Sequence, residues 1–220
     1  MEPPVEPDLY GPWRRNVWIY GLRVPFSLIF LGWITFAQAL SPAFSFKIYS
    51  LTLLASFLGL VVGAHYIDIA TSIKKFSPYF PIPAKKMLVV GILGVLAGVS
   101  VGMYLAIILS LPIFLIFVLV EGFAAIAYPR EISKPFHSYF AFGLTWGSLP
   151  FLACYFVQAR SFSLLSLAVS AFVGISVVIM HHIAIMTRES SDWKNALYLL
   201  KLYRYSIYIL AIVSLLGRLL

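Results

Sequence analysis

Long runs of apolar residues, separated by short polar stretches, dominate the chain. A helix that crosses a membrane needs about 20 consecutive residues that are mostly apolar. The runs are continuous rather than alternating, which excludes a membrane β-barrel. The pattern therefore predicts an all-α, polytopic membrane bundle of about seven transmembrane helices. The predicted spans are Val17–Leu40, Phe44–Ala64, Met87–Ala106, Ile107–Ala127, Tyr139–Gln158, Ser163–Ile185 and Leu202–Leu219.

The segments between the runs complete this prediction. No charged residue separates the third span from the fourth, so two helices fit there only if a tight turn lies near Ile107–Leu111. Residues 1–15 are rich in proline and predict an extended or disordered tail, followed by a single transmembrane domain over residues 16–220. The long connections, which are predicted to be cytoplasmic, are Asp68–Lys86, Tyr128–His137 and Thr187–Lys201.

The composition agrees with a membrane protein. Hydrophobic residues make up 61% of the chain and charged residues 11%, whereas a soluble domain is about 45–50% apolar and about 25% charged. These proportions exclude a soluble globular enzyme, and they also exclude a disordered chain. Cys154 is the single cysteine, which excludes an intrachain disulfide and a thiolate metal cage.

Lysine and arginine are concentrated at one set of predicted helix ends, with ten residues against three. Because positive charge marks cytoplasmic loops, the N-terminus is predicted to be cytoplasmic and the C-terminus outside, in a multi-pass protein of the cell membrane. This topology accounts for the net charge of +8 without a nucleic-acid partner. The ten are Arg14, Arg15, Lys74, Lys75, Lys85, Lys86, Arg130, Lys134, Arg188 and Lys194, and the three are Lys47, Arg160 and Arg218.

Two polar rows lie at the predicted inner ends of the second and sixth spans. Residues spaced i, i+3 and i+7 share one face of a helix, so each row presents its side chains together. Carboxylates in such rows bind Mg²⁺, and lysine or arginine neutralises phosphate oxygens. The first row is His65, Asp68 and Ser72, and the second is His182, Ile185 and Glu189, with His181, Arg188 and Asp192 on the neighbouring stripe.

The rows predict a site for a metal–diphosphate or another anionic head group, open to the cytoplasm. The alternative is that they mark only the boundary at which helices leave the hydrocarbon. Glu121 is a separate candidate, because it lies well inside the fourth predicted span. An ionisable residue at that depth is expensive and faces a cavity or a partner. Its carboxyl group is either part of a binding site or protonated and bonded to a neighbouring helix.

Three stretches resemble motifs of the UbiA-like superfamily of intramembrane prenyltransferases. Gly63–Ser72 stands where that family has Asn-Asp-x-x-Asp-x-x-x-Asp, and Phe80–Lys86 resembles its Arg-Pro-Ile-Pro-Ser-Gly-Lys loop. Tyr128–Arg130, followed by Phe142-Gly143 and Gly147–Pro150, is similar to the family's tyrosine, basic loop and glycine-containing fifth helix. The resemblance covers roughly residues 14–220 and is that of a divergent, shortened member, because the family's last two helices are absent.

The resemblance implies a particular chemistry. Members of the family use two Mg²⁺ ions, held by the acids after the second and sixth helices, to ionise a prenyl diphosphate and alkylate an acceptor. In an active member, Asp68, Glu189 and Asp192 would be the catalytic residues, with Asp68 and Asp192 as Mg²⁺ ligands. The candidate substrate-binding residues are His65, Ser72, Lys74, Lys75, Lys85, Glu121, Arg130 and Arg188.

The departures from the motifs change the expected function. In the first motif, His65 replaces the first aspartate and Ser72 the last, and neither register of the second motif contains two aspartates. The remaining acids hold one ion at best, although a leaving diphosphate carries about three negative charges that need stabilisation. We therefore expect a non-catalytic or altered member that binds a lipid, an isoprenoid or a quinone, or that serves as an accessory subunit of a membrane complex.

Alternatives stay open at this point. One is an active Mg²⁺-dependent prenyltransferase in which lysine and arginine replace part of the metal charge. Another is a haem-b-binding respiratory subunit, because His65 and either His181 or His182 lie at one depth on different helices and such pairs ligate haem axially. A transporter is a further alternative, although the charge pattern shows no paired broken helices.

Overall fold

A computed structural model describes residues 17–71, 83–129, 138–189 and 192–220. Within these ranges the chain forms helices and no strands, which confirms the all-α class. The predicted tail over residues 1–15 lies outside the described residues. The helices are α2 (Val17–Gly21), α3 (Val24–Leu40), α4 (Phe46–Ser56), η1 (Phe57–Ala64), α5 (His65–Thr71), α7 (Ala84–Ile108), α8 (Pro112–Ala127), α9 (Tyr139–Gly143), η3 (Leu144–Ser148), α10 (Leu149–Ala159), α11 (Leu164–Glu189) and α12 (Trp193–Leu219), of which η1 and η3 are π-helices.

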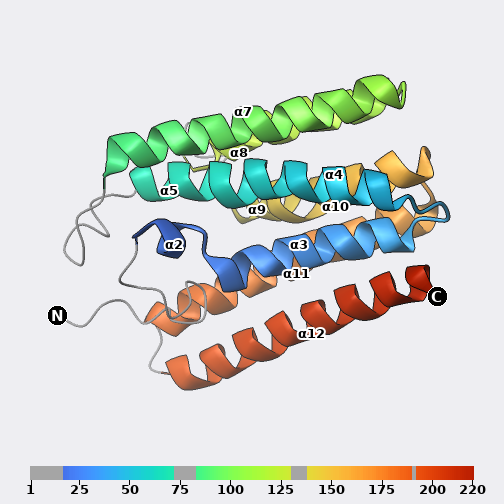
Figure 1. The fold of residues 1–220 in the computed structure, drawn as a ribbon. Coiled ribbons are helices and arrows are strands. Elements are labelled where there is room, and N and C mark those ends of the chain that lie inside the picture. Colours follow the sequence, from blue (N-terminus) through green and yellow to red (C-terminus); the bar gives the residue numbers. More distant parts are fainter. Residues whose placement is uncertain (1–16, 72–82, 130–137, 190–191) are drawn as a thin grey trace.

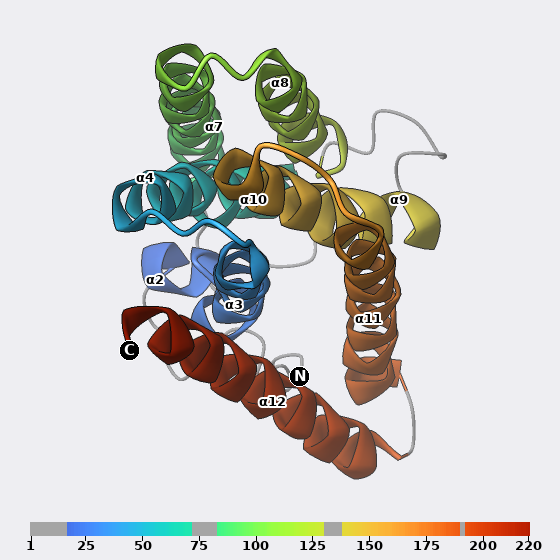
Figure 2. The ribbon, with the colours of Figure 1, turned by 90° about the vertical axis from the view of Figure 1, so that its right-hand side faces the viewer.

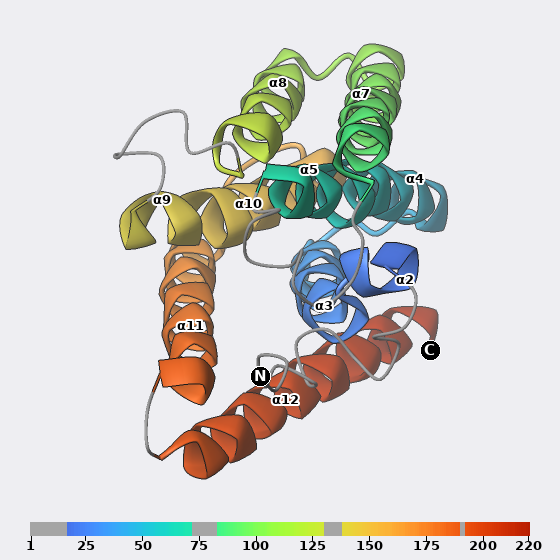
Figure 3. The same ribbon diagram turned by 90° about the vertical axis from the view of Figure 1, so that its left-hand side faces the viewer.

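The helices form a bundle whose successive rods run in alternating directions (Figure 1). Seen end-on, α7 and α8 form an outer layer above the rods α4–η1–α5 and α9–η3–α10 (Figures 2 and 3). On the other side of these rods, α12 packs across α3 and reaches α11. We call the end at which α5 ends and α7 begins the inner end, because the charge pattern predicts that it faces the cytoplasm. The C-terminus lies at the opposite, outer end.

Five helical rods in the described ranges are long and apolar enough to cross a membrane. They are Phe46–Thr71, Ala84–Ile108, Tyr139–Ala159, Leu164–Thr187 and Trp193–Leu219. The helices α3 and α8 are apolar but shorter than these five. The lengths and compositions of the five long rods are those of a membrane protein with several transmembrane helices. This agrees with the predicted helical membrane bundle.

The first predicted span, Val17–Leu40, is wrong as a single helix. The chain breaks at Leu22–Arg23, and Arg23 has a left-handed backbone with φ 45°. Pro25 lies in the first turn of α3, where its missing N–H costs nothing. In a helix that continued from α2, it could not donate to the carbonyl oxygen of Gly21, and its ring would clash with that carbonyl group. The break leaves α3 with 17 residues, or about 25 Å at 1.5 Å per residue.

Two other predicted boundaries have different outcomes. The turn expected near Ile107–Leu111 is confirmed, because α7 ends at Ile108 and α8 begins at Pro112 with Ser110 at φ 54° between them. The connection predicted over Thr187–Lys201 is wrong, because α11 continues to Glu189 and α12 begins at Trp193. In the described part of this stretch, Lys194 and Asn195 are polar residues at exposed positions of α12, where the apolar pattern does not reveal a helix.

Glycines bring the outer layer close to the rod beneath it. A Cβ at Gly98 of α7 would lie 2.6 Å from the carbonyl oxygen of Ala55 and 2.7 Å from the amide nitrogen of Gly59. A Cβ at Gly94 would lie 2.9 Å from the carbonyl oxygen of Leu58. Small residues permit this backbone approach between membrane helices. Gly94 and Gly98 therefore form a seam of α7 against α4 and η1.

Candidate functional site

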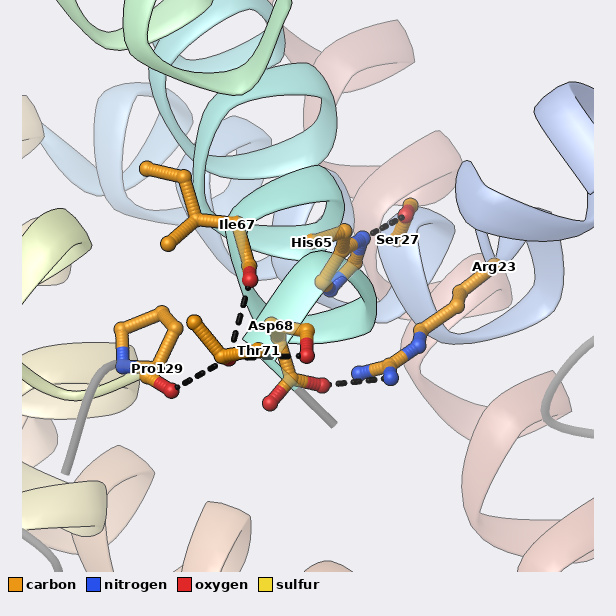
Figure 4. A network of polar contacts seen from close by, with 7 residues as sticks. All are labelled: Arg23, Ser27, His65, Ile67, Asp68, Thr71 and Pro129. Carbon is orange, nitrogen blue, oxygen red and sulfur yellow. Dashed lines mark hydrogen bonds and ion pairs between the residues drawn. The ribbon is translucent and has the colours of Figure 1, made fainter. Parts of the chain in front are cut away.

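The first polar row brings α5 against the beginning of α3. Asp68 Oδ2 accepts a hydrogen bond from Arg23 Nη2 at 2.5 Å, in an ion pair whose side chains are 14% (Arg23) and 30% (Asp68) exposed. Arg23 stands in the break between α2 and α3, and its left-handed backbone begins the turn from which α3 starts. The pair therefore ties the end of α5 to the break (Figure 4).

His65 lies one turn before Asp68 and is buried, with 2% of its surface exposed. Its Nδ1 is 3.3 Å from Ser27 Oγ, and that hydroxyl donates to the carbonyl oxygen of Leu22 at 2.5 Å. Because the Ser27 proton is already used, Nδ1–H is the donor, and the tautomer follows from this network. The prediction that His65 and Asp68 share one face is confirmed, since both reach the start of α3 (Figure 4).

Aromatic rings continue from His65 across the inner half of the bundle. The His65 ring stacks on Trp146 of η3, with centroids 5.6 Å apart and an interplanar angle of 10°. Trp146 contacts Phe142 at 6.1 Å, and Phe142 contacts His181 of α11 at 4.3 Å. We call the connected rings the inner aromatic cluster. It comprises Phe26, Phe30, His65, Tyr128, Tyr139, Phe142, Trp146, His181 and His182.

The second polar row is more exposed than the first. His182 is exposed, and Tyr139 packs edge-on against both His181 and His182 at 5.9 and 6.2 Å. Asp192 is exposed before the first turn of α12, where its Oδ1 accepts a hydrogen bond from Asn195 Nδ2 at 2.8 Å. The rings of Trp146 and Phe142 lie between His65 and His181, so the two histidines are joined by packed rings.

Several candidate residues fall outside the described part of the chain. This holds for the whole of Ser72, Lys74, Lys75 and Arg130, and for the side chains of Arg188 and Glu189. Lys85 is described and is exposed in the first turn of α7. At the ends of α5 and α8, Thr71 Oγ1 donates to the carbonyl oxygen of Pro129 at 2.9 Å, which brings these two helix ends together (Figure 4).

A magnesium ion needs several oxygen ligands in near-octahedral geometry, usually from carboxylates, phosphates and water. Among the described side chains, no three histidine, cysteine, aspartate or glutamate groups lie together as such a site would require. Asp68 already receives the guanidinium of Arg23, and Asp192 receives the amide of Asn195. Both predicted Mg²⁺ ligands, Asp68 and Asp192, are therefore bonded to other side chains.

Glu121 lies elsewhere, in the wall of a cavity beneath α7 and α8. Both of its carboxylate oxygens are buried and have no hydrogen-bond partner among the described residues. The other polar side chains of the wall are those of Thr52, Ser56 and Cys154. Of the two possibilities left open by the sequence, the structure places Glu121 in a cavity and shows no bond to a neighbouring helix in the described ranges.

Three residues of the site were not singled out as candidates from the sequence. Arg23, Ser27 and Trp146 pair with Asp68 or His65 from helices far away in the chain. One available signal was an arginine inside an apolar run, because an intramembrane charge needs a partner. No local signal marks Trp146, since its role depends on how η3 packs against α5.

Comparison with known proteins gives no relative from which a function follows. No protein-family model, no curated protein and no solved structure matches the chain.

Proposed function

We propose that this chain is a non-catalytic integral membrane protein on a UbiA-like scaffold, and that it binds an uncharged isoprenoid lipid or quinone at the inner aromatic cluster. The observation that carries the proposal is that the described residues of the first polar row contact other side chains of the chain. Asp68 pairs with Arg23, and His65 stacks on Trp146. On the resemblance to the UbiA-like family, the ion pair and the ring stack would lie where that family binds metal–diphosphate.

Charge supports an uncharged ligand over a diphosphate. A diphosphate needs metal ions or unpaired cations to stabilise its negative charge. The guanidinium of Arg23 is already engaged by a carboxylate, so the pair offers little positive charge to an anion. An isoprenoid alcohol or a quinone makes no such demand, because it requires apolar contact and a few hydrogen bonds.

The rings support an apolar ligand. Tyr139 and Phe140 at the start of α9 are 50% and 78% exposed, and Tyr139 belongs to the inner aromatic cluster. Tyrosine and tryptophan combine a large apolar surface with a polar atom, which suits them to a boundary between lipid and water. A flat ring or an isoprenoid chain that enters from the membrane at α9 would meet Phe140 and Tyr139 before it meets the buried rings.

The test is native mass spectrometry of the chain purified in mild detergent, with decylubiquinone and farnesol added as probes. We expect a bound uncharged lipid or probe in the wild-type protein and weaker binding in Phe140→Ala. The matched control is Phe46→Ala, because Phe46 is a 59% exposed phenylalanine at the outer end, in the first turn of α4. Equal binding by the two variants, or a tightly bound prenyl diphosphate with Mg²⁺, would overturn the proposal.

A further inference from the structure

A second candidate site lies away from the inner aromatic cluster, in the cavity beneath α7 and α8. Its volume is about 90 Å³, and its wall is formed by α4, η1, α7, α8 and α10. Most of the wall consists of glycine, alanine and other apolar residues, including Gly59, Gly98 and Gly122. Gly98 lies in this wall where the α7 seam approaches the backbone of η1.

Glu121 carries the only charged side chain in the described wall of this cavity. At 1.5 Å per residue, it lies about 14 Å from the start of α8 and about 9 Å from its end, so it is far from both helix ends. Neither carboxylate oxygen has a hydrogen-bond partner among the described residues. An ionised carboxylate in apolar surroundings is very costly unless a positive charge accompanies it.

The size of the cavity limits what that charge can be. An engineered cavity of about 150 Å³ holds benzene, whereas one water needs only about 10–15 Å³ of such space. A volume of about 90 Å³ is smaller than that benzene cavity and large enough for a small ion with a few waters, in a cavity that is partly open to its surroundings. This ligand differs from the one proposed for the inner aromatic cluster.

Two hydroxyl groups share the wall of this cavity with the carboxylate. Thr52 Oγ1 donates its proton to the carbonyl oxygen of Ile48 at 2.7 Å, which leaves its lone pairs to accept a hydrogen bond or to bind a cation. Ser56 contributes a second hydroxyl to the wall. Hydroxyl and carboxylate oxygens are the ligands that hard cations prefer.

We propose that Glu121 and the hydroxyls of Thr52 and Ser56 form a reversible binding site for a monovalent cation, which is either a proton or Na⁺. Each of these cations neutralises the carboxylate, and binding of Na⁺ to the protonated form releases one proton to water. The described wall contains one other titratable group, the Cys154 thiol, and no lysine, arginine or histidine that could supply the charge instead.

Infrared difference spectroscopy tests this site on the full chain in a detergent without carbonyl groups. The carbonyl stretch of a protonated carboxyl group is recorded in wild type and in Glu121→Gln, and their difference isolates Glu121. We expect a Glu121 signal at acid pH that is lost as the pH rises. Loss on addition of NaCl at constant pH, but not of choline chloride, would identify Na⁺ as a ligand, and loss with pH alone would identify the proton.

Two outcomes would overturn the proposal. A Glu121 signal that is identical at all pH values and in both salts would mean a permanently neutral structural acid. The absence of a Glu121 signal under all conditions would mean a permanently ionised group.

A variant that fills the cavity provides a second measurement. Ala125 lies one turn after Glu121 in the same wall, so Ala125→Leu should exclude the ion and abolish the Na⁺-dependent or pH-dependent change. Its control is Ala168→Leu, at an exposed position on α11 that lies outside the described wall. A normal response in Ala125→Leu would contradict the assignment of the cavity.

Discussion

Arg23 and Asp68 form an ion pair across 45 residues of sequence, and they join the end of α5 to the break between α2 and α3. The pair occupies the place at which the sequence predicted a Mg²⁺ ligand. Arginine and carboxylate form one of the stronger polar interactions when they are partly withdrawn from water. Here both side chains are partly exposed, so the pair gives a definite geometry and a moderate contribution to stability.

Removing one member of this pair should destabilise the inner end. For Asp68→Asn, we expect the free energy of unfolding to fall by about 1.5–3 kcal/mol, the range for hydrogen bonds to charged groups. Arg23→Gln should have a similar effect, and the double variant should cost less than the two single changes together, because the residues interact directly. Thermal unfolding in detergent measures all four proteins. Strict additivity would contradict the pair.

The close packing at the glycine seam predicts that an added side chain will destabilise the protein. Gly98→Ala should destabilise the protein by about 1–3 kcal/mol, because the added Cβ would press against the backbone of Ala55 and Gly59. Gly217→Ala is the matched control, since a Cβ there meets nothing within 4 Å. That control should be neutral or stabilising by up to about 1 kcal/mol through helix propensity. Equal unfolding temperatures for the two variants would argue against the close approach of α7 and η1.

A shared hydroxyl connects three helices on the other side of the bundle. Tyr203 Oη of α12 accepts hydrogen bonds from Trp33 Nε1 of α3 at 3.2 Å and from Ser176 Oγ of α11 at 2.9 Å. Tyr203→Phe leaves both donors unpaired in an apolar setting, so we expect a loss of about 1–3 kcal/mol. Tyr205→Phe is the control, because Tyr205 is 52% exposed. A loss in the control as large as in Tyr203→Phe would contradict the role of this hydroxyl.

Arg160 ends α10 in a left-handed conformation, with φ 59°. A side chain in this conformation costs about 1–2 kcal/mol relative to glycine. Arg160→Gly should therefore raise stability by up to about 1 kcal/mol, once the greater freedom of glycine in the unfolded chain is included. Ser161→Gly should instead lower stability or leave it unchanged, because Ser161 has no positive φ to relieve. Unfolding temperatures in the opposite order would contradict this account of the helix end.

The sequence predicts the helices better than it predicts their partners. Apolar runs located the main rods because each rod is defined by local composition, and the absence of charge near Ile107–Leu111 still allowed a turn. The pattern failed at Arg23, where the proline two residues later breaks the helix. It also failed at Trp193, where α12 begins in a polar stretch. At Arg23 the backbone geometry interrupts a run that is mostly apolar, and after Trp193 the helix continues through exposed residues that are not apolar.

For the candidate site, the sequence predicted which residues share a helix face, but not which residues of other helices they contact. The spacing of His65 and Asp68 correctly placed both on one face of α5, because helical periodicity is local. Their partners Arg23, Ser27 and Trp146 come from other segments of the chain, and these contacts depend on tertiary packing that local sequence patterns do not reveal. The cavity beside Glu121 is likewise formed by residues of several helices, each unremarkable in its own segment.

The most direct test of the central claim is Mg²⁺-dependent release of pyrophosphate from a prenyl diphosphate by the purified chain in lipid vesicles. The proposed function predicts no release above that of empty vesicles, because it assigns the Asp68 carboxylate to its ion pair with Arg23 and not to a metal ion. Release that requires Mg²⁺ and is abolished by Asp68→Ala would contradict it, and it would make the chain an active prenyltransferase.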